Sequence, residues 1–147
     1  MTAVKQTYEA MFLISQAEAA DLSTVVAHIE EIMHRGHADV LAMRKWDERR
    51  LAYEIGKQRR GFYVLCYFAA PASDLSHIER DCNLSERILR TLIIRADHLT
   101  PEEIASADDR SGLATEAKLR AARAAERAVR PEDEAPAPPT VEEAPSA

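Results

Sequence analysis

The sequence is poor in residues that build disulfide scaffolds, and it has no long apolar run. Its 147 residues include two cysteines, Cys66 and Cys82, four glycines and one tryptophan. No stretch approaches the roughly 20 apolar residues of a membrane span. Residues 1–15 lack the long apolar segment and cleavage pattern of a secretory signal. We therefore expect a cytosolic protein with free thiols and no membrane association.

Motifs typical of enzymes are also missing. The sequence contains no Walker-type phosphate loop, no nucleophile elbow and no recognisable Cys–His pair. His34 and His37 straddle the expected end of a helix, but Asp39 is the only acid nearby, and a metal site needs further ligands. We therefore expect no catalytic residue, no metal, no cofactor and no small-molecule substrate.

The negative net charge comes mainly from the C-terminal end of the chain. Residues 1–100 carry 13 Lys and Arg against 14 Asp and Glu, and residues 101–130 carry six of each. Residues 131–147 carry five acids, no base and five prolines. This composition predicts a disordered acidic tail. The sequence pI of 5.4 therefore does not exclude a nucleic-acid partner for the rest of the chain.

Apolar periodicity predicts an α+β domain in the first 98 residues. Asp21 is a plausible N-cap for the first helix, Gly36 a plausible end, and Pro71 ends the third strand. The pattern predicts strands over 7–15, 38–46 with 48–55, 62–70 and 88–96, and helices over 22–34 and 72–84. This is the order of the ferredoxin-like split βαβ fold, a four-stranded antiparallel sheet with two helices on one face. We expect the first and third strands to be central and the other face to be open.

The chain changes character after residue 98. Thr100, Pro101 and the acids that follow are a good helix start. Residues 112–130 are rich in Ala and Arg but have few large apolar side chains, which predicts a marginal or partner-stabilised helix. The expected division is a ferredoxin-like domain over 1–98, a helical extension over 99–130 and the disordered tail over 131–147.

Basic residues gather around the connection between the second and third strands. Residues 44–60 carry seven cations against three acids. Lys57, Arg59 and Arg60 lie on the expected turn, "GKQRRG", where no apolar packing requires them. A solvated turn would explain these charges without a ligand. Binding to RNA phosphates explains them better, because further arginines lie at and along the fourth strand: Arg87, Arg90 and Arg95.

The third strand allows two assignments of its faces. The segment "RGFYVLCY", residues 60–67, partly matches the third-strand pattern of RNA-recognition motifs, in which Phe62 would point outward and stack on a base. Tyr63 and Val64 do not fit that pattern. The other assignment buries the even-numbered residues from 62 to 68 against the helices and places the odd-numbered ones on the open face. We favour the second, because it matches the apolar row of the first strand.

Several segments together resemble the family of bacterial small-subunit ribosomal protein six. The most specific is "WDERRLAYEIGK", residues 46–57, and it is accompanied by Tyr8-Glu9, "YVLCYFAAP" and "SERILRTLIIRAD". The resemblance covers residues 5–98. Asp47 and Glu48 stand where the family has a glycine and a basic residue, and Glu54 replaces a frequent proline. These departures add acids beside the basic cluster.

The resemblance implies a structural component of the small ribosomal subunit, cytoplasmic and without catalysis or cofactor. Family members dock with the small-subunit protein numbered eighteen, and the pair binds the central domain of 16S rRNA. The expected RNA-binding residues are Lys45, Arg49, Arg50, Lys57, Arg59, Arg60, Arg87 and Arg90. The expected partner interface is Trp46, Leu51 and Tyr53, for each of which burial in the core is the alternative. Two other functions are weighed, a free-standing RNA-recognition-type module for single-stranded RNA and a small ferredoxin-like enzyme.

Overall fold

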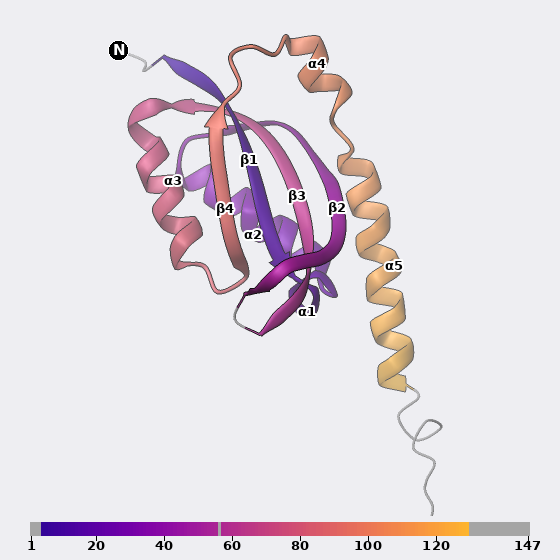
Figure 1. Ribbon diagram of the computed structural model, residues 1–147. Helices are drawn as coiled ribbons and strands as arrows, with labels where there is room; N and C mark the ends of the chain where they lie inside the picture. Colours follow the sequence, from indigo (N-terminus) through magenta and orange to yellow (C-terminus); the bar gives the residue numbers. More distant parts are fainter. Residues whose placement is uncertain (1–3, 56, 130–147) are drawn as a thin grey trace, which may run out of the picture.

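Four strands form one antiparallel sheet in the order β2-β3-β1-β4. The structure, a computed structural model, describes residues 4–55 and 57–129 (Figure 1). The elements are β1 (Lys5–Ser15), α1 (Gln16–Ala19), α2 (Leu22–Arg35), β2 (Asp39–Ile55), β3 (Gln58–Pro71), α3 (Ala72–Leu84), β4 (Ile88–Arg95), α4 (Pro101–Ser106) and α5 (Arg110–Val129). The ferredoxin-like fold and the central position of β1 and β3 are confirmed. The tail predicted over 131–147 lies outside the described residues.

Helix α2 ends where it meets α3. The backbone N–H of Gly36 donates to the carbonyl oxygens of Ile32 and Met33, each at 3.1 Å, and so closes the last turn. A Cβ atom at position 36 would lie 2.2 Å from Cγ1 of Ile78 on α3. The glycine therefore allows the end of α2 to pack directly against α3 in the helix layer.

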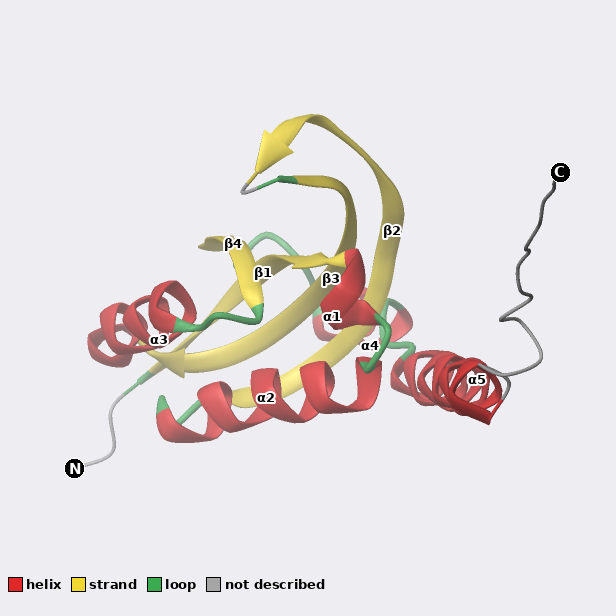
Figure 2. Ribbon diagram, turned by 90° about the horizontal axis from the view of Figure 1, so that it is seen from below, coloured by secondary structure: helices red, strands yellow, loops and turns green. Residues whose placement is uncertain are grey.

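Helices α2 and α3 cover one face of the sheet (Figure 2). Phe62, Val64, Cys66 and Phe68 of β3 are fully buried on this side, in one cluster with apolar residues of α2 and α3. Tyr63, Leu65 and Tyr67 point to the opposite face. The favoured face assignment of the third strand is therefore confirmed. Burial raises the pKa of the Cys66 thiol to about 12 and that of Cys82 to about 11, so both thiols stay protonated near neutrality.

The turn between β2 and β3 is shorter than predicted. Gln58 pairs with Ile55, so β3 begins three residues before Gly61. Arg59 and Arg60 consequently belong to the strand, and their prediction as turn residues is wrong. Lys57 has a φ of 73°, a backbone conformation that suits a tight hairpin connection. The pairing is irregular between Arg50 and Ile55, where the register shifts before the Ile55–Gln58 pair closes the hairpin.

The face opposite α2 and α3 is covered at one end, contrary to the expectation of an open face. Ile104 of α4 is buried in a second cluster with Ala42, Leu65, Tyr67 and Ala96. The predicted helix start is confirmed, because Thr100 Oγ1 accepts from the Glu103 backbone N–H and Glu103 Oε1 accepts from the Thr100 N–H. The remaining, uncovered part of this face is called the open face below.

Helix α5 packs beside α2 and the edge strand β2 (Figure 1). Leu113 and Ala117 are buried in the same cluster as the core of the sheet. The loop before α5 binds the backbone of β2, because Asp108 Oδ1 accepts from the Met43 N–H at 3.0 Å and the Asp109 N–H donates to the Met43 carbonyl at 2.9 Å. These contacts protect part of an edge strand that would otherwise present unpaired groups. The domain boundary expected near residue 98 stays a prediction.

Candidate nucleic-acid interface

The open face contains an apolar groove, because the far ends of β2 and β3 curve away from the helix layer (Figure 2). The groove has a volume of about 430 Å³. Its lining residues are Met11, Leu13, Leu51, Ala52, Tyr53, Ile55, Tyr63, Arg90, Thr91 and Leu92. The curvature brings β2 close to the central strands, since a Cβ atom at Gly61 would lie 2.3 Å from Leu13 Cδ1 and 3.0 Å from Leu51 Cδ2. Glycine is therefore required here for close packing.

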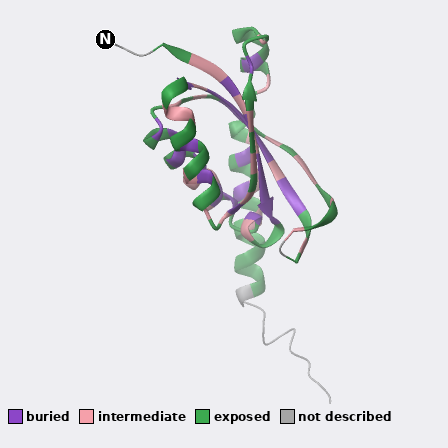
Figure 3. Cartoon of the chain, turned by 60° about the vertical axis from the view of Figure 1, so that its left-hand side comes forward, coloured by how far each residue is buried: buried purple, intermediate pink, exposed green. Residues whose placement is uncertain are grey.

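The three residues predicted for a protein interface come together on this face. Trp46 is 42% exposed and Tyr53 65% exposed, whereas Leu51 is half-buried in the wall of the groove. Trp46 packs edge-on against Tyr63, with ring centroids 5.4 Å apart. The Arg49 guanidinium lies 4.7 Å from the Trp46 ring centroid, and that of Arg90 lies 5.9 Å from Tyr53. The result is a surface of partly exposed aromatic and cationic side chains, and Figure 3 colours the far end of the β2–β3 hairpin as exposed or intermediate.

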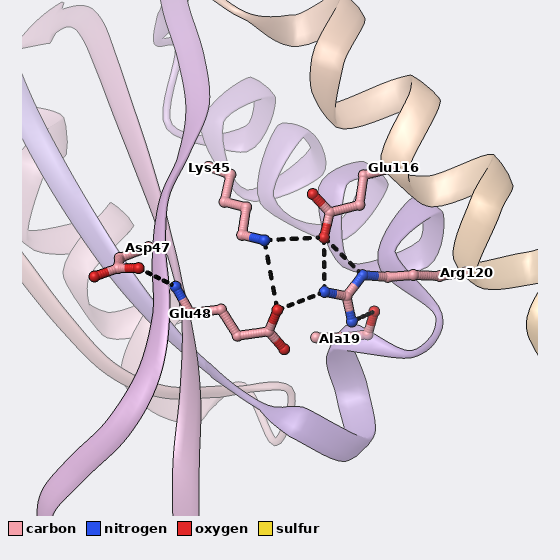
Figure 4. Close-up of polar contacts among 6 residues, drawn as sticks. All are labelled: Ala19, Lys45, Asp47, Glu48, Glu116 and Arg120. Atoms are coloured by element: carbon pink, nitrogen blue, oxygen red, sulfur yellow. Dashed lines mark hydrogen bonds and ion pairs between the residues drawn. The ribbon is translucent and has the colours of Figure 1, made fainter.

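Lys45 lies in a cluster of ion pairs on the helix side of β2 (Figure 4). Its Nζ is 3.4 Å from Glu48 Oε1 and 3.2 Å from Glu116 Oε2 of α5. Arg120 binds the same two carboxylates at 2.8 and 2.6 Å. Both cations also lie 5.0 Å from the centroid of the Phe62 ring. The four charged residues Lys45, Glu48, Glu116 and Arg120 are called the latch cluster below.

The latch cluster stabilises the charged forms of Glu116 and Arg120. Burial alone would raise the pKa of Glu116, but hydrogen bonds from Arg120 and Lys45 outweigh it and hold this pKa below its ordinary value. Burial alone would likewise lower the pKa of Arg120, but Glu116 and Glu48 raise it. Lys45 is therefore engaged in ion pairs within the protein, with Glu48 and Glu116. No local pattern indicates this role, because Glu116 and Arg120 lie about 70 residues away in the chain.

Three more of the predicted RNA-binding cations have acidic partners. Arg49 binds Asp47 at 2.6 Å, Arg59 binds Glu54 at 3.1 Å, and Arg87 binds Glu18 at 2.9 Å. A hydrogen bond from Arg49, with another from the Glu48 N–H, holds the pKa of Asp47 below its ordinary value. The three acids that depart from the family pattern, Asp47, Glu48 and Glu54, thus each neutralise a neighbouring cation.

The other predicted cations are not paired in this way. Within residues 4–55 and 57–129, no carboxylate lies within 4.0 Å of the side-chain nitrogens of Arg50, Lys57, Arg60 or Arg90. All four side chains are exposed. Arg50 and Arg60 are direct cross-strand partners near the end of the β2–β3 hairpin. Like charges facing each other across a ladder are destabilising, so an anion bound between them would be favourable.

Among the described residues, no three or more His, Cys, Asp and Glu side chains lie together in a group that could bind a metal ion. Among them, no helix is long and apolar enough to cross a membrane.

The fold and this surface define a ferredoxin-like α+β protein with an aromatic, partly cationic sheet face. The model of the family "Ribosomal protein S6" matches residues 7–95. The chain belongs to this family. Helices α4 and α5 lie beyond the matched residues.

Individual relatives agree with this assignment. The chain is 34% identical over 99 residues to small ribosomal subunit protein bS6 of Rhodopirellula baltica, covering 67% of this chain and 71% of the relative. It is 32% identical over 91 residues to bS6 of Desulforamulus reducens, covering 61% of this chain and 96% of that protein. The crystal structure of 30S ribosomal protein S6 from Thermotoga maritima has a similar fold, with a TM-score of 0.58, 24% identity and coverage of 69% and 97%.

Proposed function

We propose that this chain is a non-enzymatic structural component of the small ribosomal subunit. In this role it binds the central domain of 16S rRNA together with the small-subunit protein numbered eighteen. The observation that carries the proposal is the family match over residues 7–95. Membership of a family of small-subunit proteins gives the chain a cytoplasmic location on the ribosome.

The proposal assigns the partner protein to the open face. Exposed aromatic side chains beside a groove are typical of a protein interface, because they bury large areas with little loss of side-chain freedom. Trp46 and Tyr53 are exposed there and Leu51 lines the groove. Arg90 lies over the Tyr53 ring and has no acidic partner among the described residues, so it adds charge that an acidic or carbonyl-rich partner segment can bind. Arg49 over the Trp46 ring, in contrast, is paired with Asp47.

RNA phosphates are assigned first to the unpaired cations of the hairpin, Arg50, Lys57 and Arg60. These residues can accept a phosphate without giving up an existing ion pair. Arg49, Arg59 and Arg87 must first exchange a carboxylate for a phosphate, and Lys45 is held by two carboxylates of the latch cluster. Their contribution to affinity is therefore smaller.

The alternative of a free-standing RNA-recognition-type module is not favoured. That function requires an exposed aromatic residue at the third-strand position of Phe62, on which a base can stack. Phe62 is fully buried under the latch cluster. To stack a base on Phe62, β3 would have to present its buried face to solvent.

Sucrose-gradient sedimentation of the full chain tests the proposal. We expect the chain to cosediment with small subunits, and to bind a transcript of the 16S rRNA central domain more tightly when protein eighteen is present. The paired change Trp46→Ala with Tyr53→Ala should weaken binding to protein eighteen, whereas Leu84→Ala, an exposed residue elsewhere, should not. Absence from small subunits, or tight RNA binding that is insensitive to protein eighteen, would contradict the proposal.

A further inference from the structure

A second groove lies between α5, α1 and the beginning of β3. Its α5 wall lies outside the residues matched to the family. Its volume is about 570 Å³. The residues that line it are Gln16, Ala17, Ala20, Glu48, Gln58, Arg120, Arg123, Ala124 and Arg127. We call it the α5 groove. Its lining is rich in polar groups and in arginine, unlike that of the apolar groove on the open face.

The α5 groove carries uncompensated positive charge. Arg120, Arg123 and Arg127 follow each other at spacings of three and four residues, so they share one side of α5. Glu48 also lines the groove, but its carboxylate is bound by Arg120 and Lys45. Among the described residues, no carboxylate lies within 4.0 Å of the side-chain nitrogens of Arg123 or Arg127. Both of these side chains are exposed.

The β2–β3 hairpin extends the same charge beyond the groove. Glu48 pairs with Phe62, and the next pair on that side of the ladder is Arg50 with Arg60. Gln58, two residues before Arg60 on the same strand, lines the groove. The unpaired arginines of the hairpin therefore lie on the same face of the ladder as Glu48 and Gln58 of the groove lining.

Contacts with β2 and α1 fix the position of α5, so its arginines are held in place before a ligand binds. The latch cluster joins α5 to β2, and Arg120 Nη1 lies 3.5 Å from the Ala19 carbonyl oxygen of α1 (Figure 4). A basic residue in the last turn of a helix also interacts favourably with the helix dipole, which accounts for Arg127. That effect is confined to the last turn and does not account for Arg123.

We infer that the α5 groove binds phosphate groups of RNA, so that the C-terminal extension supplies a second RNA contact continuous with the hairpin. This inference rests on the proposed function, because it takes RNA as the polyanion that the chain meets. An elongated row of arginines suits a polyanion with regularly spaced phosphates better than a single small anion. Such contacts position the protein on RNA without reading its sequence.

The test compares two full-length variants that remove the same charge. Arg123→Gln with Arg127→Gln alters the α5 groove. Arg80→Gln with Lys118→Gln is the control, because both residues are exposed and neither lines the groove. Lys118 in particular lies on α5 but lines a different groove, against α2. The measurement is the affinity for a transcript of the 16S rRNA central domain, with protein eighteen present, over a series of KCl concentrations.

We expect the groove variant to bind about tenfold more weakly at low salt than the control variant. The slope of log affinity against log salt should become shallower by about 1.5, which corresponds to two lost phosphate contacts. The control should keep the slope of the unaltered chain. Because all four positions are exposed, the thermal midpoints of both variants should stay close to that of the unaltered chain, and circular dichroism verifies this.

Three other outcomes would each overturn the inference. If both variants bind RNA like the unaltered chain, the groove makes no RNA contact although the proposed function stands. If both lose the same affinity, the effect is general charge attraction and the groove has no special part. If the groove variant loses protein eighteen while its RNA salt slope is unchanged, the groove is a protein interface. Failure of the unaltered chain to bind the transcript at all is a different result, which contradicts the proposed function itself.

Discussion

Gly61 shows how one residue shapes the open face. Its backbone requires no unusual dihedral angles, and its importance comes from the two leucine side chains that occupy the space where a Cβ would lie. Leu13 belongs to a central strand and Leu51 to the edge strand that curves over it. A side chain at position 61 would push these leucines apart and widen the apolar groove.

We predict that Gly61→Ala destabilises the protein by about 1–3 kcal/mol, the usual cost of overpacking a filled site. Urea unfolding followed by Trp46 fluorescence measures this change. The double variant with Leu13→Ala makes room for the new methyl group, so its destabilisation should be less than the sum of the two single changes by at least about 0.5 kcal/mol. Strictly additive effects would show that the contact with Leu13 is not the cause.

Three further residues explain why site prediction from the sequence was only partly informative. Asp47, Glu48 and Glu54 depart from the family pattern. Their effect depends on which cations they reach, and this is set by strand curvature and by α5. Charge counting over residues 44–60 therefore overstates the number of cations available to RNA.

At the scale of elements, α5 is held by ion pairs as well as by apolar contacts. Its buried apolar residues, Leu113 and Ala117, lie in its first half. The sequence predicted a marginal or partner-stabilised helix from the same shortage of large apolar residues. The latch cluster, which lies within the chain itself, stabilises α5 in place of the external partner that the sequence pattern suggested.

We predict that α5 loosens in acid through Glu116. The pKa of Glu116 is lowered in the folded state, so its contribution to stability is fully present above its ordinary value near 4.5 and is lost as the pH falls through the lower folded value. The protection factors of the α5 amides, which correct for the slower intrinsic exchange in acid, should therefore fall below about pH 4.5. Mass spectrometry of peptides from residues 110–129 measures this exchange.

The variant Glu116→Gln identifies the residue responsible. It should reduce the opening free energy of α5 by about 1–2 kcal/mol at neutral pH, less than the full value of hydrogen bonds to a charged group because Glu116 is partly exposed, and weaken the pH dependence. Glu126→Gln on the same helix is the control, because among the described residues no cation lies within 4.0 Å of Glu126. Equal behaviour of the two variants would mean that other carboxylates control the docking of α5.

At the scale of the whole molecule, the extension and the ferredoxin-like domain share one core. Leu113 packs with the main cluster, Ile104 with the cluster on the opposite face, and the loop between their helices binds the backbone of β2. The extension thus holds the sheet from both faces and along one edge.

We predict that residues 4–129 unfold in a single cooperative transition at neutral pH. The transition should have the same midpoint when followed by Trp46 fluorescence, which reports on the sheet, and by hydrogen exchange of α5. The reason is that separating α4 and α5 from the sheet would expose Ile104, Leu113 and their buried partners together. A separate, earlier transition confined to residues 101–129 would show that the extension is an independent unit.

The order of strands and helices in the ferredoxin-like domain and the inward faces of the first and third strands were determined by the sequence by itself. Both follow from local periodicity, which is a property of neighbouring residues. The family was also recognisable from short segments such as residues 46–57. The tertiary structure decided which cations are available, what covers the second face of the sheet and where α5 lies. These features depend on contacts such as Lys45 with Glu116, between residues far apart in the chain, whose distances are fixed only when the sheet has folded and curved.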